Sequence, residues 1–529
     1  MKAGAAVHST STKTNSGFRN LQIELYKTEN CHYVFDARKV VFLEVDELVF
    51  ALLKKLRETR LEVDELVKAL PQYAGEEIRD ACREIEELQK DGYLTHSGFC
   101  RSSQYTRSDF EDALSNRLSG LTVYVTTECN LACSYCIYGG QYGRHRRLSG
   151  ISMTWDTAKN VIDFLVAHSE KSKSLRLDFF GGEPLLAFDL IQRSVAYLKT
   201  ILGPDRPSVT ITIASNGTIL TEEILSFLIE HKVLFQFSID GDKEIHDRNR
   251  RFKSGNHGSH DLVKKNLQRI YDYDPKYFRQ CVRVKGVMTM QTLDSADEFF
   301  SGNPLVKILA NEGHLTILLK EPHYDIEQDA DYFEQIHSLG QRLLETNGYT
   351  KLSEVLEPLT FRQRTLFAHV FGEFTEVQSV NKVFFGDSDM VTFRKGCLMG
   401  FQEAAVYPDG DISICHKASS FVIGNINKGS WNFDKIWELH SRLHEWPECE
   451  SCFVQRFCTL CYEKLRDGSR DWTETRNKFC DFSRKQYHVV FYYMLKLLDK
   501  NPQLWTDLDE LAAGKIEEKL KELEEGAAE

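Results

Sequence analysis

Three cysteines with metal-ligand spacing lie within residues 126–140. Cys129, Cys133 and Cys136 follow the pattern C-x3-C-x2-C, directly after a strand-like run at 121–125. Three thiolates on one loop can hold a four-iron, four-sulfur cluster and leave its fourth iron open to a small chelating ligand. Three cysteines with a fourth ligand from elsewhere can also hold zinc. The spacing alone therefore predicts a metal site and leaves both metals open.

A glycine-rich turn follows the next strand-like run, at 175–180, and reads Gly181-Gly182-Glu183-Pro184. Glycine carries no side chain, so a ligand can approach the backbone closely at these positions. The carboxylate of Glu183 can hold an amino group. The turn therefore predicts a second part of the same site, suited to a ligand with an amine.

The two motifs together resemble those of the radical S-adenosylmethionine (radical SAM) superfamily. The resemblance implies that the three cysteines hold a [4Fe-4S] cluster, that S-adenosylmethionine chelates its fourth iron, and that Glu183 binds the methionine amino group. One-electron reduction by an external donor such as flavodoxin or ferredoxin would then yield a 5′-deoxyadenosyl radical. In such enzymes the protein supplies position and shielding from water. With both motifs present, zinc at these cysteines is disfavoured.

Further cofactor contacts are implied at the ends of later strand-like runs. Ser215-Asn216-Gly217 and Ser238-Ile239-Asp240-Gly241 are ordinary turn sequences when taken alone. By resemblance, Ser215 and Asn216 face the methionine and ribose, and Ser238 and Asp240 reach the ribose.

Two more cofactor-binding residues are assigned by the same resemblance. Tyr135 lies where the family has an aromatic residue next to the adenine. Arg250 is our choice for the methionine carboxylate, because a guanidinium pairs with a carboxylate through two hydrogen bonds.

A second array of cysteines lies near the C-terminus and is close to the pattern of the SPASM auxiliary-cluster domain. That pattern has three residues between its fifth and sixth cysteines, whereas this chain has only Thr459 and Leu460. The array consists of Cys397, Cys415, Cys449, Cys452, Cys458, Cys461 and Cys480.

The family's interleaved pairing implies two auxiliary [4Fe-4S] clusters. One would be held by Cys449, Cys452, Cys458 and Cys480. The other would be held by Cys397, Cys415 and Cys461, with its fourth iron either completed by another side chain or open to a substrate thiolate. Zinc sites that staple a loop-rich domain are the alternative, but zinc could not serve electron transfer.

One position in this array separates related functions. His416 follows Cys415, where sulfatase maturases of the resembling family have a catalytic aspartate. A Cys-His pair is more similar to the thioether-forming peptide maturases of the ranthipeptide and sactipeptide type. His416 is a candidate for an acid or base role, and packing or hydrogen bonding is the competing interpretation.

The composition limits partners and compartment. The 529 residues carry 78 Asp and Glu against 66 Lys and Arg, a formal charge of -12, which argues against a nucleic-acid partner. No apolar run is long enough to cross a bilayer, and residues 1–17 lack the apolar middle of a secretory signal. We therefore expect a cytoplasmic protein without membrane contact, whose clustered cysteines bind metal.

The N-terminal elements predict a small recognition domain at 18–98. Strand-like runs at 21–25, 33–35 and 40–43 precede three helical segments between 46 and 89. This order resembles the winged-helix-like element that recognises precursor peptides, in which the leader adds as an extra strand to a sheet edge. A winged-helix nucleic-acid binder and a simple packing domain are the alternatives.

From residue 121 the chain alternates between strands and helices. This alternation predicts a parallel sheet, and six units match the partial (β/α)6 TIM barrel of the radical family. The chemistry should gather at the C-terminal strand ends. We predict an α/β fold with these boundaries: a disordered tail at 1–17, the recognition domain at 18–98, the barrel at 99–325, a helical bridge at 326–396, the SPASM domain at 397–484 and C-terminal helices at 485–529.

The leading functional hypothesis is an enzyme that modifies a ribosomally made precursor peptide bound through its leader. A carbon radical on the peptide core would couple to a cysteine sulfur to form a thioether. Carbon-carbon crosslinking, epimerisation and formylglycine formation in a sulfatase are the competing enzymatic readings. A non-catalytic iron-sulfur scaffold or carrier is the alternative class, and the G-G-E-P turn argues against it because a carrier needs no cofactor pocket.

Overall fold

The computed structural model describes most of the chain between residues 21 and 528. The predicted tail at 1–17, most of the predicted helical bridge and Cys397 lie outside the described residues. The described residues are 21–59, 61–95, 106–136, 138–139, 149–202, 208–288, 299, 302–319, 326–345, 348–356, 404–444, 446–449, 451–462, 465 and 472–528.

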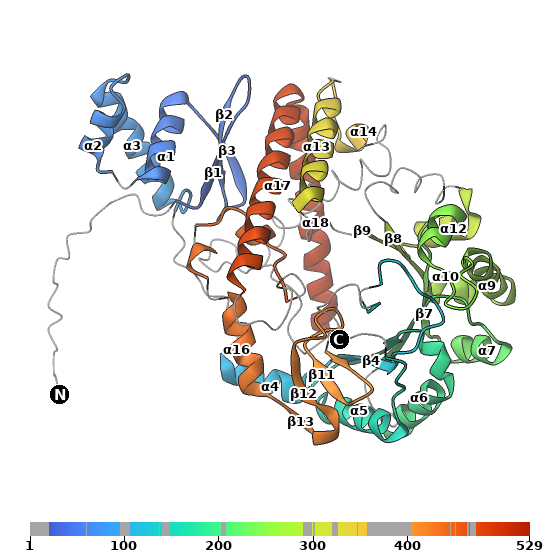
Figure 1. Cartoon of the computed structure of the whole chain (residues 1–529). Coiled ribbons are helices and arrows are strands. Elements are labelled where there is room, and N and C mark those ends of the chain that lie inside the picture. Colours follow the sequence, from blue (N-terminus) through green and yellow to red (C-terminus); the bar gives the residue numbers. More distant parts are fainter. Residues whose placement is uncertain are drawn as a thin grey trace, which may run out of the picture.

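The N-terminal unit is a three-stranded antiparallel sheet followed by three helices, in the predicted order (Figure 1). Its strands alternate between two apolar faces. Leu25 and Val34 pack against the unit's own helices, whereas Tyr26 and Phe35 face the opposite way. The elements are β1 Ile23–Lys27, β2 His32–Asp36, β3 Val41–Val45, α1 Glu47–Glu58, α2 Val63–Ala69 and α3 Gly75–Lys90.

Six parallel strands form the centre of the molecule, as the alternation predicted. They lie side by side in chain order, and Figure 1 shows the helices along their outer side. The strands are β4 Gly120–Thr126, β5 Ser174–Gly181, β6 Ser208–Ser215, β7 Leu234–Ser238, β8 Val282–Met288 and β9 Leu315–Leu319. The helices are α4 Arg107–Asn116, α5 Trp155–Ala167, α6 Phe188–Leu202, α7 Glu222–Glu230, α8 Lys243–Asn249, α9 His260–Tyr273, α10 Pro275–Cys281 and α12 Pro304–Asn311.

Local signals fix several of these boundaries. Thr154 caps α5, because its hydroxyl accepts a hydrogen bond from the backbone N–H of Thr157 at 3.2 Å. Asp46 caps α1 in the same way through Val49.

The auxiliary cysteine unit continues the central sheet. β10 pairs in parallel with β4, and the backbone N–H of Thr122 donates to the carbonyl of Ala404 at 2.9 Å. The sequence analysis treated these units as separate, because a parallel pair between segments so far apart leaves no local signal. The elements are β10 Ala405–Val406, β11 Asp411–Ser413, β12 Val422–Asn425, β13 Ser430–Trp431, α16 Phe433–His444 and the short helical turns η3 Ile426–Lys428, η4 Pro447–Cys449 and η5 Gln455–Phe457.

The C-terminal helices join the N-terminal unit to the auxiliary unit. α17 (Thr473–Lys500) lies beside β1 (Figure 1), and Phe491 from this helix packs on Phe35 with ring centroids 5.0 Å apart. The boundary that we predicted between residues 484 and 485 falls inside α17, so Cys480 and the following residues belong to one helix. The remaining helices here are α13 Ile326–Leu343, α14 Leu352–Leu356 and α18 Gln503–Ala528.

Candidate metal and cofactor sites

The loop with Cys129, Cys133 and Cys136 starts where β4 ends. A later segment holds it through three backbone hydrogen bonds, since Ala132 and Ser134 donate to the carbonyls of residues 251 and 249 at 2.8 and 2.9 Å, and Lys253 donates to the carbonyl of residue 130 at 3.0 Å. These contacts were not predicted from the sequence. Backbone hydrogen bonds do not depend on side-chain type, so no residue pattern indicates them.

The two glycines of the G-G-E-P turn bring β5 against the cysteine loop. A Cβ atom on Gly181 would lie 2.1 Å from the carbonyl oxygen of Thr126, and one on Gly182 would lie 2.1 Å from that of Glu128. Gly181 also has a φ of +140°, a conformation that favours glycine. The close approach that we predicted for a ligand is thus made, at these two atoms, by the chain's own backbone.

Glu183 lies at the centre of a buried hydrogen-bond network. Its side chain is fully buried and accepts hydrogen bonds from the Ser215 hydroxyl at 2.9 Å, the Asn216 N–H at 2.8 Å and the Leu185 N–H at 3.1 Å. Burial raises the pKa of Glu183 to about 7, although these donors act in the opposite direction. The network fixes the carboxylate beside the cysteine loop. Pro184 follows as the first residue of η1 (Pro184–Ala187).

Asn216 links that carboxylate to the metal-binding loop. Its side-chain nitrogen donates to the Asn130 side chain at 2.8 Å and lies 3.9 Å from the sulfur of Cys129. Its oxygen accepts from the Thr218 hydroxyl at 2.6 Å. Asn216 therefore bridges the end of β6 and the cysteine loop, and Ser238 ends the neighbouring strand β7.

Tyr135, Asp240 and Arg250 form one buried cluster next to the loop. Arg250 donates to Asp240 through Nε at 2.9 Å and Nη2 at 3.2 Å, and its guanidinium carbon lies 5.4 Å from the centre of the Tyr135 ring. The hydroxyl of Tyr135 and the N–H of Val287 also donate to Asp240. The sequence analysis gave Asp240 and Arg250 separate ligands, whereas the structure pairs them with each other.

The donor set at this loop fits an iron-sulfur cluster. Burial raises the pKa of Cys129 to about 12 and that of Cys133 to about 11, so both thiols are protonated at neutral pH unless a cation binds. Arg250 opposes the rise at Cys133. Three thiols around one turn, next to the carboxylate of Glu183, match a cluster with one iron left for an amino acid ligand.

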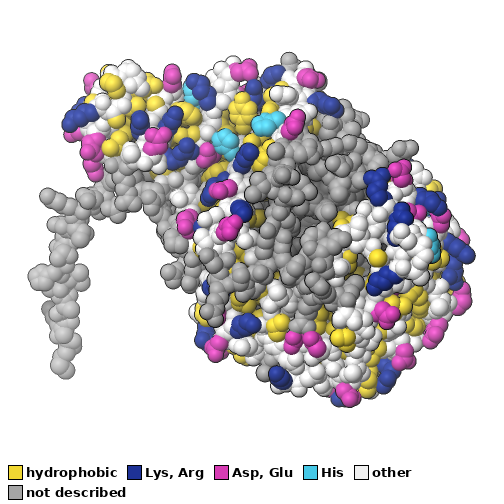
Figure 2. Space-filling model, in the orientation of Figure 1, with side chains coloured by type: hydrophobic (Ala, Val, Ile, Leu, Met, Phe, Trp, Pro, Cys, Tyr) yellow, Lys and Arg dark blue, Asp and Glu magenta, His cyan; other side chains and the backbone are white. Residues whose placement is uncertain are grey.

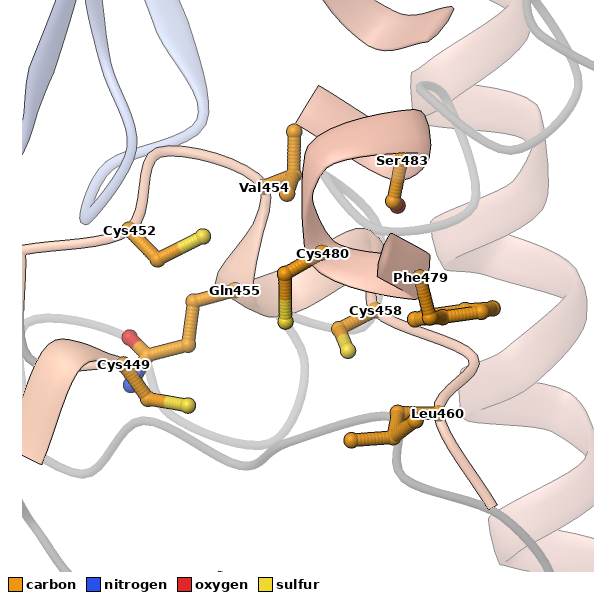
Figure 3. A pocket seen from close by; sticks show the side chains of 9 residues that line it. All are labelled: Cys449, Cys452, Val454, Gln455, Cys458, Leu460, Phe479, Cys480 and Ser483. Carbon is orange, nitrogen blue, oxygen red and sulfur yellow. The ribbon is translucent and has the colours of Figure 1, made fainter. Parts of the chain in front are cut away.

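Four cysteines of the auxiliary array surround one pocket. Figure 3 shows the sulfur atoms of Cys449, Cys452, Cys458 and Cys480 directed into it, with Val454, Gln455, Leu460, Phe479 and Ser483 as the other lining residues. Cys480 comes from α17, and the other three come from the loop around η4 and η5. Burial raises the pKa of Cys480 to about 11, and the neighbouring thiols Cys449 and Cys452 add to the rise. Four sulfurs around an enclosed apolar space fit a [4Fe-4S] cluster with four cysteine ligands.

Cys415 and Cys461 lie elsewhere in the auxiliary unit, and both are near Tyr462. Burial raises the pKa of the Tyr462 hydroxyl, and these two thiols add to the rise. The third cysteine that the resemblance assigned to this cluster, Cys397, lies outside the described residues.

His416 is held by tyrosines of the barrel. Its carbonyl accepts hydrogen bonds from the hydroxyls of Tyr138 at 2.8 Å and Tyr124 at 3.2 Å, and its ring lies 5.7 Å from that of Phe180. Burial lowers the pKa of His416 to about 3, and nearby cations such as Lys417 add to the effect. The imidazole is therefore neutral near pH 7.

The surface carries both signs of charge. On the face shown in Figure 2, Lys and Arg side chains alternate with Asp and Glu over the described residues. Among the helices of the described part of the chain, none combines the length and the apolar character needed to cross a membrane.

Two protein families match this chain. The radical SAM superfamily matches residues 123–291, and the SPASM iron-sulfur cluster-binding domain matches residues 397–462. The first match covers the cysteine loop and the G-G-E-P turn, and the second covers all but one of the auxiliary cysteines.

Several known proteins are similar to parts of the chain. The radical SAM cyclopropyl synthase TigE of Paramaledivibacter caminithermalis is 26% identical over 234 residues, which is 42% of this chain and 48% of the relative. A cysteine-type anaerobic sulfatase-maturating enzyme of Clostridium perfringens is 24% identical over 71% of this chain and 96% of its own length. Native anSMEcpe with bound AdoMet and the Cp18Cys peptide has a TM-score of 0.45 at 18% identity, over 70% of this chain and 98% of that chain. The chain spans about half the length of TigE and of two further relatives.

The matched regions coincide with the two places where the structure gathers thiols. The chain therefore carries a radical SAM domain and a SPASM domain, and the cofactors that these domains bind are [4Fe-4S] clusters and S-adenosylmethionine.

Proposed function

We propose that the chain is a peptide maturase that docks the leader of a ribosomally made precursor peptide and joins a cysteine sulfur of its core to a carbon. The observation that carries this proposal is the placement of the N-terminal unit. One face of its sheet packs on the auxiliary unit, where the rings of Phe35 and Phe457 are 6.3 Å apart. A peptide held by this sheet is anchored next to a metal-binding part of the chain.

The leader would bind to β3. This strand ends the sheet, and in the described part of the chain it pairs only with β2. Phe42, Leu43 and Val45 are half-buried, whereas Glu44 is exposed. An edge strand of this kind offers backbone groups for main-chain pairing and alternating side chains for selection. The exposed carboxylate favours a leader with a basic residue opposite it.

The barrel residues would hold the cofactor and keep water away. S-adenosylmethionine, when bound at the reduced cluster, supplies a hydrogen-abstracting radical. Glu183 would hold its ammonium group, and Arg250 would hold its carboxylate through N–H groups that do not face Asp240. Tyr135 would flank the adenine, and Ser238 with Asn216 would face the ribose. Each of these groups except Arg250 comes from the C-terminal end of a parallel strand or from the loop after it, and Arg250 follows α8, the helix after β7.

The auxiliary unit would take the substrate sulfur. Cys415 and Cys461 would hold an auxiliary cluster with one iron left for a peptide thiol, which that iron would make more acidic. The unit would thereby hold the sulfur beside the peptide carbon from which a hydrogen atom is removed. Such a cluster would also supply an acceptor for the one electron that a sulfur-carbon coupling releases, so the peptide would lose two hydrogens in all, one hydrogen atom from carbon and one proton from sulfur. His416, next to Cys415, is too weak a base to hold this proton, because burial lowers its pKa to about 3.

The test is anaerobic turnover of a cysteine-containing precursor encoded beside this gene. We expect a product lighter by two hydrogens, formed together with 5′-deoxyadenosine. Cys415→Ala should abolish crosslinking and still cleave S-adenosylmethionine, and a precursor with serine at the acceptor position should bind without reacting. Crosslinking by Cys415→Ala at the wild-type rate would contradict sulfur ligation. A loss of two hydrogens that persists after every peptide cysteine is alkylated would indicate carbon-carbon coupling.

Formylglycine formation in a sulfatase is the second candidate, favoured by the similarity to the Clostridium perfringens sulfatase-maturating enzyme over 96% of that enzyme's length. The product distinguishes the two, because formylglycine has lost the cysteine sulfur and a thioether retains it. Turnover of a sulfatase-derived cysteine peptide with loss of sulfur, and none of the neighbouring precursor, would favour this candidate. A cyclopropane-forming reaction, which the name of the relative TigE suggests, would also remove two hydrogens from the peptide. It would still occur after the peptide cysteines are alkylated.

A further inference from the structure

A histidine of α8 lies buried next to the pair formed by Asp240 and Arg250. His246 is 0% exposed, and Asp240 and Arg250 are 0% and 7% exposed. None of the proposed metal or cofactor contacts uses the His246 side chain. A buried imidazole needs a hydrogen-bond partner for each of its two ring nitrogens, so the partners of His246 indicate what this residue does.

Three hydrogen bonds connect the backbone of Asp240 to the backbone of Arg250 through the imidazole. The backbone N–H of Asp240 donates to Nδ1 of His246 at 3.4 Å, and Nε2 of His246 lies 3.0 Å from Oγ of Ser259. The Ser259 hydroxyl then donates to the carbonyl oxygen of Arg250 at 2.8 Å, and Ser259 is 1% exposed. The chain of hydrogen bonds therefore joins the two residues whose side chains pair with each other.

Each group in this chain has only one possible role. A backbone N–H can only donate, so Nδ1 of His246 must be the unprotonated, accepting nitrogen. The carbonyl of Arg250 can only accept, so the Ser259 hydroxyl uses its one proton there and must accept from Nε2–H of His246. Burial lowers the pKa of His246 to about 4, and the charge of Arg250 adds to the effect. The imidazole is therefore neutral near pH 7 and carries its proton on Nε2.

The segment that carries Arg250 is also bound to the cysteine loop. The carbonyls of residues 249 and 251 accept backbone hydrogen bonds from that loop at 2.9 and 2.8 Å, whereas the carbonyl of Arg250 between them accepts from Ser259. Further along the chain, Arg251 pairs antiparallel with Gly258, which brings Ser259 back beside Arg250. Three successive carbonyls are thus held by two different partners, the cysteine loop and the chain of hydrogen bonds through His246.

The fixed backbone determines where the guanidinium of Arg250 lies. Asp240 accepts from Nε at 2.9 Å and from Nη2 at 3.2 Å, and the guanidinium carbon lies 5.4 Å from the centre of the Tyr135 ring. Asp240 takes two of the five N–H groups of the guanidinium, and three are left for a ligand. A shift of the backbone at Asp240 or at Arg250 would turn these three groups to a new direction.

We propose that His246 is a positioning residue for S-adenosylmethionine binding, which fixes the backbone of Arg250 relative to that of Asp240 through Ser259 and so directs the remaining N–H groups of the guanidinium at the methionine carboxylate. His246 does not touch the cofactor in this role. A binding group keeps its productive geometry only when the residues behind it are themselves held by packing and hydrogen bonds. The inference rests on the function proposed above for Arg250.

The test is the dissociation constant for S-adenosylmethionine, measured by equilibrium dialysis with the full reconstituted chain, together with iron content. Ser259→Ala removes the hydroxyl that joins His246 to Arg250, and His246→Leu removes both ring nitrogens. Each should weaken binding about tenfold, as the loss of a buried hydrogen bond would. Iron content and the rate of 5′-deoxyadenosine formation at saturating cofactor should stay at the wild-type level, whereas a merely structural role would lower both. If His246→Leu loses iron, Ser259→Ala decides, because it removes a single atom.

Arg250→Lys separates this inference from the function proposed for Arg250. Lysine keeps the charge beside Asp240 but lacks the planar set of N–H groups. Binding should weaken, and adding Ser259→Ala should cause no further loss, because the two residues act as one unit. Unchanged binding by Arg250→Lys would reject the carboxylate-binding role and this inference with it. Weaker binding by Arg250→Lys, with either wild-type binding by Ser259→Ala or fully additive losses in the double variant, would overturn the positioning role alone.

His257→Leu is the matched control, because it makes the same change in the same turn. The His257 ring is exposed, stacks on Phe252 with the ring centroids 4.7 Å apart and takes no part in the chain of hydrogen bonds. This variant should bind S-adenosylmethionine like the wild type. A loss of affinity as large as that of His246→Leu would show that any disturbance of the turn weakens binding, and it would overturn the proposal.

Discussion

Gly182→Ala should displace the cysteine loop from β5 while leaving every proposed metal- and cofactor-binding side chain in the sequence. The added Cβ would lie 2.1 Å from the carbonyl oxygen of Glu128 and 3.0 Å from the Cβ atom of Cys129. Gly182 is not among the glycines with positive φ, so the substitution is purely a steric perturbation. A Cβ atom essentially never lies within 3.0 Å of a non-neighbouring heavy atom, so β5 and the loop must separate by about 0.9 Å.

The size of the effect follows from that displacement. Extra atoms in a packed site cost about 1–3 kcal/mol, and a misplacement of about 1 Å can reduce catalysis by about 100-fold. We therefore expect 5′-deoxyadenosine formation to fall by about 100-fold, while the iron bound by the auxiliary cysteines is retained. Melting of the whole chain is a poor measure here, because a protein with several metal-bound units does not unfold in two states.

The assay is iron content together with 5′-deoxyadenosine quantified after anaerobic reconstitution. Gly302→Ala is the matched control, because a Cβ atom there meets nothing within 4 Å, and it should behave like the wild type. A Gly182→Ala protein that cleaves S-adenosylmethionine at the wild-type rate would show that the close approach of β5 does not position the cofactor.

Three further predictions concern the cofactor site and the N-terminal unit. The pKa of Glu183 is raised to about 7 by burial, so the carboxylate that we propose holds the cofactor ammonium group forms as the pH rises through 7. Affinity for S-adenosylmethionine in equilibrium dialysis should therefore weaken below that pH, and Glu183→Gln should bind weakly at every pH. Replacing Cys129, Cys133 and Cys136 by Ala should remove about four irons and all cofactor cleavage while the auxiliary iron remains; unchanged iron would contradict the assignment. Added leader peptide should slow amide hydrogen exchange in β3 by at least about tenfold and leave α3 unchanged, whereas protection elsewhere would move the docking site.

Deleting the N-terminal unit is a poor test of leader binding. The second face of the sheet shares a core with Phe457 and Phe491, which are 1% and 0% exposed. Removing residues 21–95 would expose this aromatic surface and remove Gln22, whose side-chain amide donates a hydrogen bond to the carbonyl of Cys452. Variants within β3 leave that core intact and are therefore the better probes of recognition.

Local sequence patterns predicted the helices, the strands and the metal-binding cysteines, but not the contacts between residues that are distant in the chain. Cys129 and Glu183 were identifiable because their motifs span only a few consecutive residues. The pairing of Asp240 with Arg250 was not predicted, because the two residues lie ten positions apart on either side of α8 and no helical or strand periodicity relates them. The contact of Gln22 with Gln455 joins residues 433 positions apart, and no periodicity or motif in either segment records it.

The shared sheet indicates how the two metal-binding domains keep a fixed relation. β10 adds directly to β4, the strand that leads into the first cysteine loop. Three buried tyrosines reinforce this junction. The rings of Tyr124, from β4, and Tyr407 stack with their centroids 4.4 Å apart. The Tyr124 hydroxyl forms hydrogen bonds with the Tyr138 hydroxyl and with the carbonyl of His416. Tyr138 lies near both Cys136 and Cys415, since both thiols raise the pKa of its hydroxyl. A rigid junction of this kind holds constant the distance between radical generation and the auxiliary thiols, which a sulfur-carbon coupling requires and a flexible linker would not provide.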